Sequence, residues 1–408
     1  MEDNDMKNIT GGVCAAKGFQ AAGVHCGVRK NKTKKDLALI YSPVRCAAAG
    51  VYTRNLVKGA PIAVTKANIA DGYAQAVVCN SGNANTCNAN GIEIAEGMCA
   101  LTAQALNINA KDVIVASTGV IGQQMTLEPF EAGIPAAAKA LGMNNDDAAQ
   151  AIMTTDTVDK QQAVSFEIGG VECRMGGMAK GSGMIHPNMA TMLVFITTDA
   201  AISPAMLQKA LSHVVDYTFN MVSVDGDTST NDTCAIMASG MAGNAMIDAE
   251  GEAYDIFCAA LYEVMKNLSR CIAADGEGAT RLLECTVSGA AELETARIAA
   301  KAVICSSLVK AAMFGADANW GRVLCALGYC GRELDVNKID VDFASAAGTI
   351  PVCRMGAGVE FSEEIAKQIL LEKEIKILVN LNSGTECATA WGCDLTYDYV
   401  KINGDYRT

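Results

Sequence analysis

Apolar runs typical of strands alternate with amphipathic helical stretches along almost the whole of this chain. Residues 36–40 and 76–79 have strand character, whereas residues 91–106 place apolar side chains at the three- and four-residue spacing of a helix face. Residues 111–118 return to a strand pattern. With 408 residues, half of them apolar, the chain can bury a large core. The pattern predicts an α/β protein, built as a layered α+β sandwich.

The second half of the chain continues this alternation. Ser203 and Pro204 predict a helix start, with serine as the cap and proline in the first turn. Further elements are predicted as a helix over 255–271, a glycine-containing turn over 274–278, a strand over 282–287, a helix over 292–313 and a strand over 397–401. We place a domain boundary near residue 283, which gives a main domain of residues 1–283 and a smaller α+β domain of residues 284–408.

The charge distribution argues against nucleic acid or an anionic membrane as the main partner. The net charge is −13, and acidic and basic residues are scattered rather than grouped, whereas both of those partners favour clustered lysine and arginine. The one basic cluster, at residues 29–35, is short and reads as a solvated loop. The amino terminus lacks the apolar core of a secretory signal, and no segment offers about 20 uninterrupted apolar residues. We therefore expect a soluble, cytoplasmic protein.

The cysteines and histidines do not indicate a metal site. Seventeen cysteines are spread along the chain without a C-x-x-C pair, and there are only three histidines. Several cysteines, such as Cys258 and Cys325, lie in apolar runs where we expect small core residues with reduced thiols. The acidic segment 225–233 lacks the spacing of a calcium-binding loop. We expect no metal.

The segment from Lys180 to Thr191 places a threonine where a glycine-rich stretch ends and an apolar strand pattern, residues 192–198, begins. If the bond between Ala190 and Thr191 were cut, Thr191 would carry a hydroxyl and a free α-amine. The amine, with a reference pKa of about 7.7–8.0, could then accept the hydroxyl proton. Gly181, Gly183 and Pro187 make backbone strain before that bond plausible. From this segment alone, an ordinary loop entering a core strand is the other interpretation.

Three further places could contribute to a site. Thr118 and Gly119 end a strand in a polar turn, where a hydroxyl and a backbone N–H can bind an oxyanion. Glu277 lies between two glycines, so its carboxylate could hold a substrate ammonium. The chain ends in a polar tail over residues 403–408. Taken singly, Thr118 and Gly119 are better explained as an ordinary turn and the tail as a frayed terminus, whereas Glu277 is equally compatible with a solvated turn.

In combination and in order, these motifs resemble the ornithine acetyltransferase family, also called glutamate N-acetyltransferase, over nearly the whole chain. The segments that carry the resemblance are residues 18–23, 36–40, 80–85, 117–122, 153–157, 180–185, 187–193, 225–232, 314–317, 319–322 and 405–408. Departures are few: Ala318 stands where the family usually has proline, Gly404 replaces a common alanine, and the turn at residues 86–90 is altered.

The resemblance implies a self-processing enzyme with a fold similar to that of N-terminal-nucleophile hydrolases but with different connectivity. Cleavage between Ala190 and Thr191 would give an α chain of residues 1–190 and a β chain of residues 191–408, assembled as an α2β2 heterotetramer. Thr191 would be the nucleophile, and Thr118 and Gly119 the oxyanion hole. The implied substrate-binding residues are Thr154, Lys180, Thr191, Glu277, Asn403 and Thr408, so the C-terminal tail would return to the active site. Thr155, beside Thr154, is the alternative at that position.

The implied reaction moves an acetyl group from N²-acetyl-L-ornithine to L-glutamate through an acetyl-threonine intermediate, with ping-pong kinetics and no cofactor. It belongs to the cyclic route of arginine biosynthesis. Some family members also use acetyl-CoA as a donor, and no glycine-rich pyrophosphate loop in this sequence decides that point. Two other readings stay open: an N-terminal-nucleophile aminopeptidase or amidase, and an uncleaved, non-catalytic binding protein.

Overall fold

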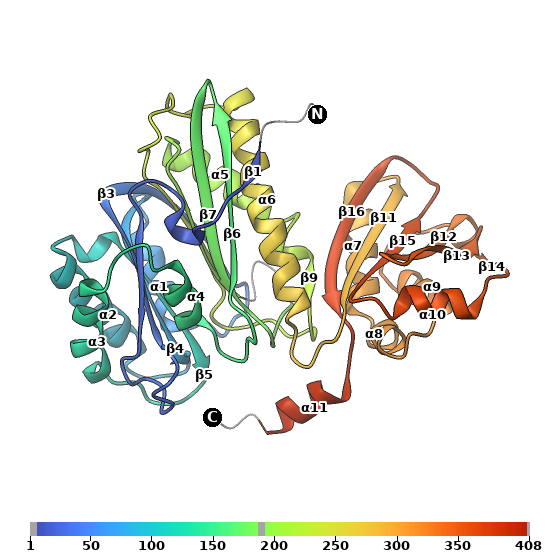
Figure 1. The fold of residues 1–408 in the computed structure, drawn as a ribbon, viewed down its shortest axis with the longest axis horizontal. Coiled ribbons are helices and arrows are strands. Elements are labelled where there is room, and N and C mark those ends of the chain that lie inside the picture. The colour runs from blue at the N-terminus through green and yellow to red at the C-terminus, as the bar shows by residue number, and fades with distance from the viewer. Residues whose placement is uncertain (1–5, 187–191, 406–408) are drawn as a thin grey trace. The chain divides into compact units, whose positions relative to one another are not determined.

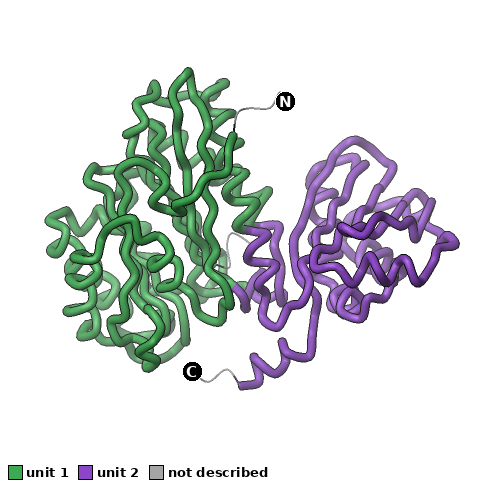
Figure 2. The backbone as a smooth tube through the Cα atoms, in the orientation of Figure 1, with its two compact units in different colours: residues 1–181, 187–219, 228–268 green, residues 182–186, 220–227, 269–408 purple. Residues whose placement is uncertain are grey.

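The computed structural model describes residues 6–186 and 192–405 (Figure 1). The chain divides into two compact units (Figure 2). Unit 1 comprises residues 1–181, 187–219 and 228–268, and unit 2 comprises residues 182–186, 220–227 and 269–408. The main division therefore falls inside helix α6 (Glu252–Ala274), after Leu268, and two short earlier segments also belong to unit 2.

In the described part of unit 1, nine strands form one hydrogen-bonded sheet in the order β1-β6-β7-β8-β10-β3-β4-β5, with β2 paired to β3. The strands are β1 (Lys7–Asn8), β2 (Gln20–Val24), β3 (Leu37–Tyr52), β4 (Tyr73–Asn83), β5 (Val113–Val120), β6 (Lys160–Ile168), β7 (Val171–Lys180), β8 (Leu193–Thr198) and β10 (Thr233–Ala238). The helices are α1 (Ala60–Asn68), α2 (Gly91–Leu106), α3 (Glu128–Lys139), α4 (Asn145–Ile152), α5 (Pro204–Val215) and most of α6.

The long strand β3 joins two halves of this sheet, and its pairing with β4 shifts register between Tyr41 and Cys46. One buried cluster contains Val77 of β4 together with Phe195 of β8 and Met237 of β10, so it lies between the two halves. Because successive side chains of a strand point to opposite faces, Val78 instead joins a second cluster with α2 and α3. On the other half, Leu268 of α6 lies over Gly177 of β7.

Helices α2 and α3 thus cover one outer face and α6 the other, whereas α4 packs into the cluster between the two halves of the sheet (Figure 1). The layered α+β sandwich expected from the sequence is confirmed. The order of the strands has a further property: β8 is hydrogen-bonded to β7 on one side and β10 on the other, and β10 also pairs with β3. Two strands that follow residue 190 are therefore inserted between two strands that precede it.

Unit 2 is built on a second sheet of seven described strands, in the order β14-β13-β12-β15-β11-β16-β9. These are β9 (Val222–Ser223), β11 (Leu282–Ala290), β12 (Asp340–Ser345), β13 (Gly348–Arg354), β14 (Ala357–Gly358), β15 (Glu374–Asn380) and β16 (Glu386–Cys393). Its helices are α7 (Leu293–Cys305), α8 (Ser307–Phe314), α9 (Trp320–Gly328), α10 (Glu363–Leu370) and α11 (Tyr397–Gly404). The face of α7 that carries Ala299 and Val303 is buried, and the helix packs on β11 and β16.

Several sequence expectations hold at the level of single elements. Helix α2 has the predicted bounds, and α5 begins at Pro204 with the Ser203 hydroxyl accepting a hydrogen bond from the N–H of Met206. Within the described ranges, no helix is long and apolar enough to cross a membrane.

Three local expectations are wrong. The single helix predicted over 292–313 is two helices, because Ser306 takes extended backbone angles and its hydroxyl caps α8 by accepting from the N–H of Val309. The strand predicted over 397–401 is helix α11, which buries none of its side chains. Cys325 is exposed and Cys258 is only half-buried, so neither is a fully buried core residue.

Candidate functional site

The predicted oxyanion pair, Thr118 and Gly119, lies near the end of β5 in unit 1. Thr118 pairs with Ser81 and Gly119 with Gly82 of the parallel strand β4. Gly119 has φ +132°, and a Cβ at this position would lie 2.3 Å from the carbonyl carbon of Gly82. Both the backbone angle and the close approach require glycine here. Thr118 is half-buried, which leaves part of the residue accessible.

A buried asparagine that the sequence did not single out supports this turn. The Nδ2 of Asn231 donates to the carbonyl oxygen of Ser117 at 3.0 Å and also to that of Ala84. Its Oδ1 accepts from the hydroxyls of Thr86 and Thr230, each at 2.6 Å. Both the NH2 group and the oxygen of this side-chain amide are therefore hydrogen-bonded, and the amide fixes the carbonyl that directly precedes Thr118.

The next residue, Asp232, reaches the start of the chain segment that follows Thr191. Its carboxyl lies near the hydroxyls of Ser229 and Thr53 and near the backbone N–H of Met192, and all three favour its ionised form. It is 1% exposed, and among the described residues its Oδ2 has no hydrogen-bond partner. Burial raises the pKa of Asp232 well above its usual range. The loop 231–232 thus touches both the oxyanion turn and the residue next to the predicted nucleophile.

Lys180, a predicted substrate-binding residue, ends β7 opposite Leu193 of β8. It is 8% exposed. Burial lowers the pKa of the Lys180 ammonium, and the nearby Asp156 carboxylate opposes this shift. Because its register partner begins β8, Lys180 lies at the same end of the sheet as Met192.

Asp156 also contacts the other predicted substrate-binding residue of unit 1. The N–H of Thr154 donates to Asp156 Oδ2 at 2.8 Å, and the N–H of Gly181 donates to Oδ1 at 2.7 Å. Among the described residues around this carboxylate, Thr154 contacts it through both its backbone N–H and its hydroxyl, whereas its neighbour Thr155 does not. The structure therefore brings Thr154 and Lys180 together around one buried carboxylate.

In unit 2, the structure joins Glu277 and Asn403. The Nδ2 of Asn403 donates to Glu277 Oε2 at 2.8 Å, although 126 residues separate the two. The backbone N–H of Glu277 donates to the carbonyl of Ser182 at 3.0 Å. A Cβ at Gly183 would lie within 2.4 Å of the Glu277 carboxylate, so glycine is needed for this approach.

Asp225 anchors the segment that leads toward the predicted cleavage position. Its carboxylate accepts from the backbone N–H groups of Met184 and Ile185 at 2.6 and 2.8 Å. The hydroxyl of Tyr399 adds a longer contact of 3.3 Å. The sequence analysis considered residues 225–233 only as a possible metal-binding loop, whereas this carboxylate binds backbone amides.

The predicted residues fall in three groups. Thr118, Gly119, Thr154 and Lys180 belong to unit 1, and Glu277 and Asn403 belong to unit 2. Ala190, Thr191 and Thr408 lie outside the described residues. The residues that sequence reasoning missed are Asp156, Asn231 and Asp232. Each lies inside a motif noted above. The only sequence signal that could have pointed to them is a polar side chain near an apolar strand.

Comparison with known proteins decides the family. The family model described as "ArgJ family" matches residues 20–408. The chain belongs to the ArgJ family. The arginine biosynthesis bifunctional protein ArgJ of Symbiobacterium thermophilum is 53% identical over 406 residues, covering 99% of this chain and 100% of that protein. The protein of the same name from Caldanaerobacter subterraneus is 50% identical over 405 residues, covering 99% of this chain and 100% of that relative.

A solved ArgJ structure gives the same result. The crystal structure of the arginine biosynthesis bifunctional protein from Bacillus halodurans matches with 47% identity and a TM-score of 0.51, covering 53% of this chain and 100% of that chain. The family expected from the sequence motifs is thus confirmed.

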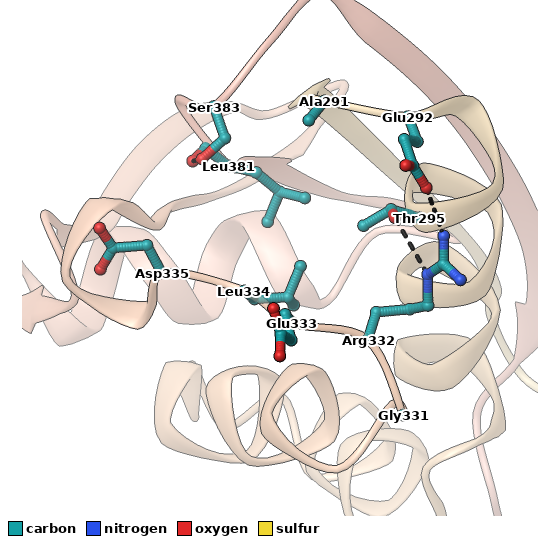
Figure 3. A pocket seen from close by; sticks show the side chains of 10 residues that line it. All are labelled: Ala291, Glu292, Thr295, Gly331, Arg332, Glu333, Leu334, Asp335, Leu381 and Ser383. Carbon is teal, nitrogen blue, oxygen red and sulfur yellow. Dashed lines mark hydrogen bonds and ion pairs between the residues drawn. The ribbon is translucent and has the colours of Figure 1, made fainter.

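One pocket of this ArgJ-family chain contains none of the residues above. It lies within unit 2, has a volume of about 470 Å³ and is lined in part by Glu292, Arg332 and Leu334 (Figure 3). Arg332 is already engaged, because it pairs with Glu292 at 2.6 Å and donates to the Thr295 hydroxyl at 3.0 Å. Within the described ranges, no group of three or more His, Cys, Asp or Glu side chains is arranged to hold a metal ion.

Proposed function

We propose that this ArgJ-family protein is an acyltransferase that moves the acetyl group of N²-acetyl-L-ornithine to L-glutamate, in arginine biosynthesis. The observation that carries the proposal is the buried loop 231–232. Asn231 fixes the carbonyl before Thr118, Asp232 lies near the amide of Met192, and the next residue, Thr233, donates its N–H to the Met192 carbonyl at 3.0 Å. Acyl transfer requires an oxyanion turn and a nucleophile, and this loop contacts both the turn and the segment that follows Thr191 in the sequence.

The reaction begins when the hydroxyl of Thr191 passes its proton to the free α-amine of the same residue. The Thr191 Oγ then attacks the acetyl carbonyl, and the resulting oxyanion accepts hydrogen bonds from the Thr118 hydroxyl and the Gly119 N–H. The C–N bond to ornithine then breaks, and the leaving amine takes the proton from the Thr191 ammonium. Acetyl-threonine and free ornithine remain. Glutamate enters, its α-amine attacks the ester carbonyl, and N-acetylglutamate leaves as the hydroxyl regains its proton.

One site must accept two amino acids whose side chains differ in charge, so the parts that they share are the natural anchors. Lys180 carries a buried amino group suited to the common α-carboxylate. Glu277 is suited to a cationic group, and Asn403, Thr154 and Thr408 complete the proposed substrate-binding set. The experiment for this role is Lys180→Ala: an unchanged KM for both amino acids would exclude Lys180 as the carboxylate anchor.

The nucleophile becomes available through self-cleavage between Ala190 and Thr191. The products are an α chain of residues 1–190 and a β chain of residues 191–408, which assemble as an α2β2 heterotetramer in the cytoplasm. The Bacillus halodurans chain supports cleavage in the family, because it is matched along its full length yet spans only about half of this chain. Intact-mass measurement tests this directly, since a single species of 42.5 kDa would contradict it.

Acetyl-CoA is the second donor that we propose. The relatives are named bifunctional, which supports two activities for one protein. Because the attack of Thr191 needs only an activated acetyl carbonyl, a thioester can load the same threonine as the acetylated amine. The test is glutamate acetylation with acetyl-CoA as the sole donor, measured beside the acetylornithine reaction.

The rival activity is hydrolysis, in which water replaces glutamate as the acceptor. The two are separated by incubating the enzyme with acetylornithine alone. Transfer predicts a single burst of ornithine that matches the amount of enzyme, followed by turnover only when glutamate is added. Continuous ornithine release without glutamate would instead favour an amidase.

A further inference from the structure

Four backbone and side-chain donors converge on Asp156, a residue to which no role has been given in the reaction above. Its side chain is fully buried. Its Oδ2 accepts from the N–H of Thr154 at 2.8 Å and from the hydroxyl of the same residue at 3.5 Å. Its Oδ1 accepts from the N–H of Gly181 and from Nζ of Lys160, both at 2.7 Å. The carboxylate therefore ties the turn after α4 to the start of β6 and the end of β7.

The charges around this carboxylate are unequal. Two lysines, Lys160 and Lys180, are near the one carboxylate, and the side chain of Lys160 is fully buried in an ion pair with it. Lys180, by contrast, makes no side-chain hydrogen bond with any described residue and is influenced by Asp156 through its charge. Burial raises the pKa of Asp156, but the charges of Lys180 and Lys160 outweigh burial and leave it below its usual range. Asp156 is consequently ionised at neutral pH.

The groups that act on Lys180 have opposite effects. Burial lowers the pKa of its ammonium, Asp156 raises it, Lys160 lowers it, and Asp232 and Cys79 raise it. Asp156 is the largest of the influences that keep the amino group protonated. A purely structural ion pair between Asp156 and Lys160 would not require a second lysine beside it.

We propose that Asp156 is a positioning residue for the amino-acid substrate: it orients Thr154 and the 180–181 segment and keeps Lys180 an ammonium that can bind the substrate α-carboxylate. The inference rests on the proposed function for the identity of that ligand. Lys160 has the opposite effect on Lys180, because its positive charge and its hydrogen bond to Asp156 weaken the stabilisation of the Lys180 ammonium by that carboxylate.

The proposal makes opposite predictions for two substitutions. Asp156→Asn keeps the shape but removes the negative charge, so Lys180 loses its proton at lower pH. Lys160→Met removes the competing positive charge, so Lys180 keeps its proton to higher pH. Each unit of change in the pKa of Lys180 alters its protonated fraction about tenfold at pH values above that pKa. If Asp156 had only a structural role, both substitutions would lower activity or stability, but they would not shift the pKa of Lys180 in opposite directions.

Two measurements report on Lys180. The first is its rate of acylation by acetic anhydride across a pH series, read by mass spectrometry of the peptide that contains Lys180, because only the neutral amine reacts. The second is KM for acetylornithine over the same series, divided by the wild-type value at each pH so that ionisation of the substrate cancels. We expect Asp156→Asn to move both profiles to lower pH and to raise KM about tenfold at alkaline pH, with a smaller change in kcat. Lys160→Met should move both profiles to higher pH.

Asp112→Asn is the matched control, because Asp112 is also buried in unit 1 and pairs with an arginine, Arg45, away from Lys180. It should leave the Lys180 profile unchanged. If Asp156→Asn does not fold, the upward shift in Lys160→Met carries the test. Unchanged Lys180 profiles, or shifts in the same direction in both variants, would overturn the role of Asp156. A wild-type protein without transfer activity would instead refute the proposed function, and the acylation profile would still report on Asp156.

Discussion

The Nδ2 of Asn403 donates a hydrogen bond of 2.8 Å to Oε2 of Glu277, which joins the last turn of α11 to the turn that follows α6. This pairing leaves Glu277 Oε1 for another partner and orients the carboxylate. Gly183 lies directly against the same carboxylate, where a Cβ would clash with it. The C-terminal segment thus contributes to the shape of a proposed substrate-binding group.

Substitution of Asn403 should weaken substrate binding according to the charge introduced. Asn403→Ala removes the two hydrogen bonds that Nδ2 donates, to Glu277 and to the Tyr399 carbonyl, at an exposed position, so we expect a loss of roughly two- to tenfold in kcat/KM. Asn403→Asp places a second carboxylate against Glu277 and should cost more, because like charges repel. Steady-state kinetics with acetylornithine measures both. Equal effects of the two substitutions would show that Asn403 does not act through the Glu277 carboxylate.

Removal of the Thr191 hydroxyl should abolish both proposed activities. We expect Thr191→Ala to remain a single 42.5 kDa chain on a denaturing gel and to transfer no acetyl group. Thr191→Ser is the control, because it retains a hydroxyl and should still be cut, at an altered rate. A Thr191→Ala protein that is cleaved at the same bond would refute self-processing by this residue.

Asn231→Ala should lower kcat through the oxyanion turn. The substitution leaves the buried carbonyl of Ser117 without its amide donor, which costs about 1–3 kcal/mol in the free energy of unfolding. The turn before Thr118 is then free to shift, and misplaced oxyanion donors lower kcat roughly tenfold or more. Asn244→Ala is the matched control, because Asn244 is equally buried and its amide binds the Ala201 carbonyl away from this turn. A similar fall in kcat in both variants would point to general instability instead.

Asp232 should give the protein a pH-dependent stability that Asp232→Asn lacks. Burial raises the pKa of Asp232 in the folded state, so above the unfolded-state pKa of about 3.9 the folded protein keeps a proton that the unfolded chain has lost. Stability from this group is therefore greatest at low pH and falls with rising pH, by up to about 1.4 kcal/mol per pH unit, until the folded-state pKa is passed.

Urea unfolding at several pH values between the unfolded-state and the folded-state pKa of Asp232 measures this effect. Both proteins should carry Thr191→Ala, so that each unfolds as one uncut chain. We expect the stability of the Asp232→Asn protein, relative to its parent, to increase as the pH rises. Parallel pH profiles for the two proteins would contradict a neutral, buried Asp232.

The fold class could be predicted from the sequence because strand and helix periodicities are local. The break at Ser306 was missed because helical apolar spacing continues across it, and only the hydroxyl cap of α8 marks the new start. The residues of α11 alternate as in a strand, but none is buried, so no sheet selects that pattern. The unit boundary has no linker signal because α6 runs through it without interruption.

The candidate site could be predicted only in part, for a different reason. Thr118, Lys180 and Glu277 lie in recognisable motifs at the ends of elements. The roles of Asp156 and Asn231 depend on partners that are distant in sequence, such as Gly181 for the first and Ser117 for the second. Periodicity cannot reveal such contacts, because a polar residue beside a strand reads equally well as solvated loop.

The insertion of β8 and β10 between β7 and β3 determines how the proposed cleavage would change refolding of the protein. Before the cut, these strands return to their places as parts of one molecule. After it, the same sheet belongs to two polypeptides, and its reassembly depends on their concentration. The uncut precursor should regain its structure equally well at any dilution, whereas recovery of the cut protein from denaturant should fall as it is diluted. The mature protein would then keep its architecture chiefly because the two polypeptides are never apart.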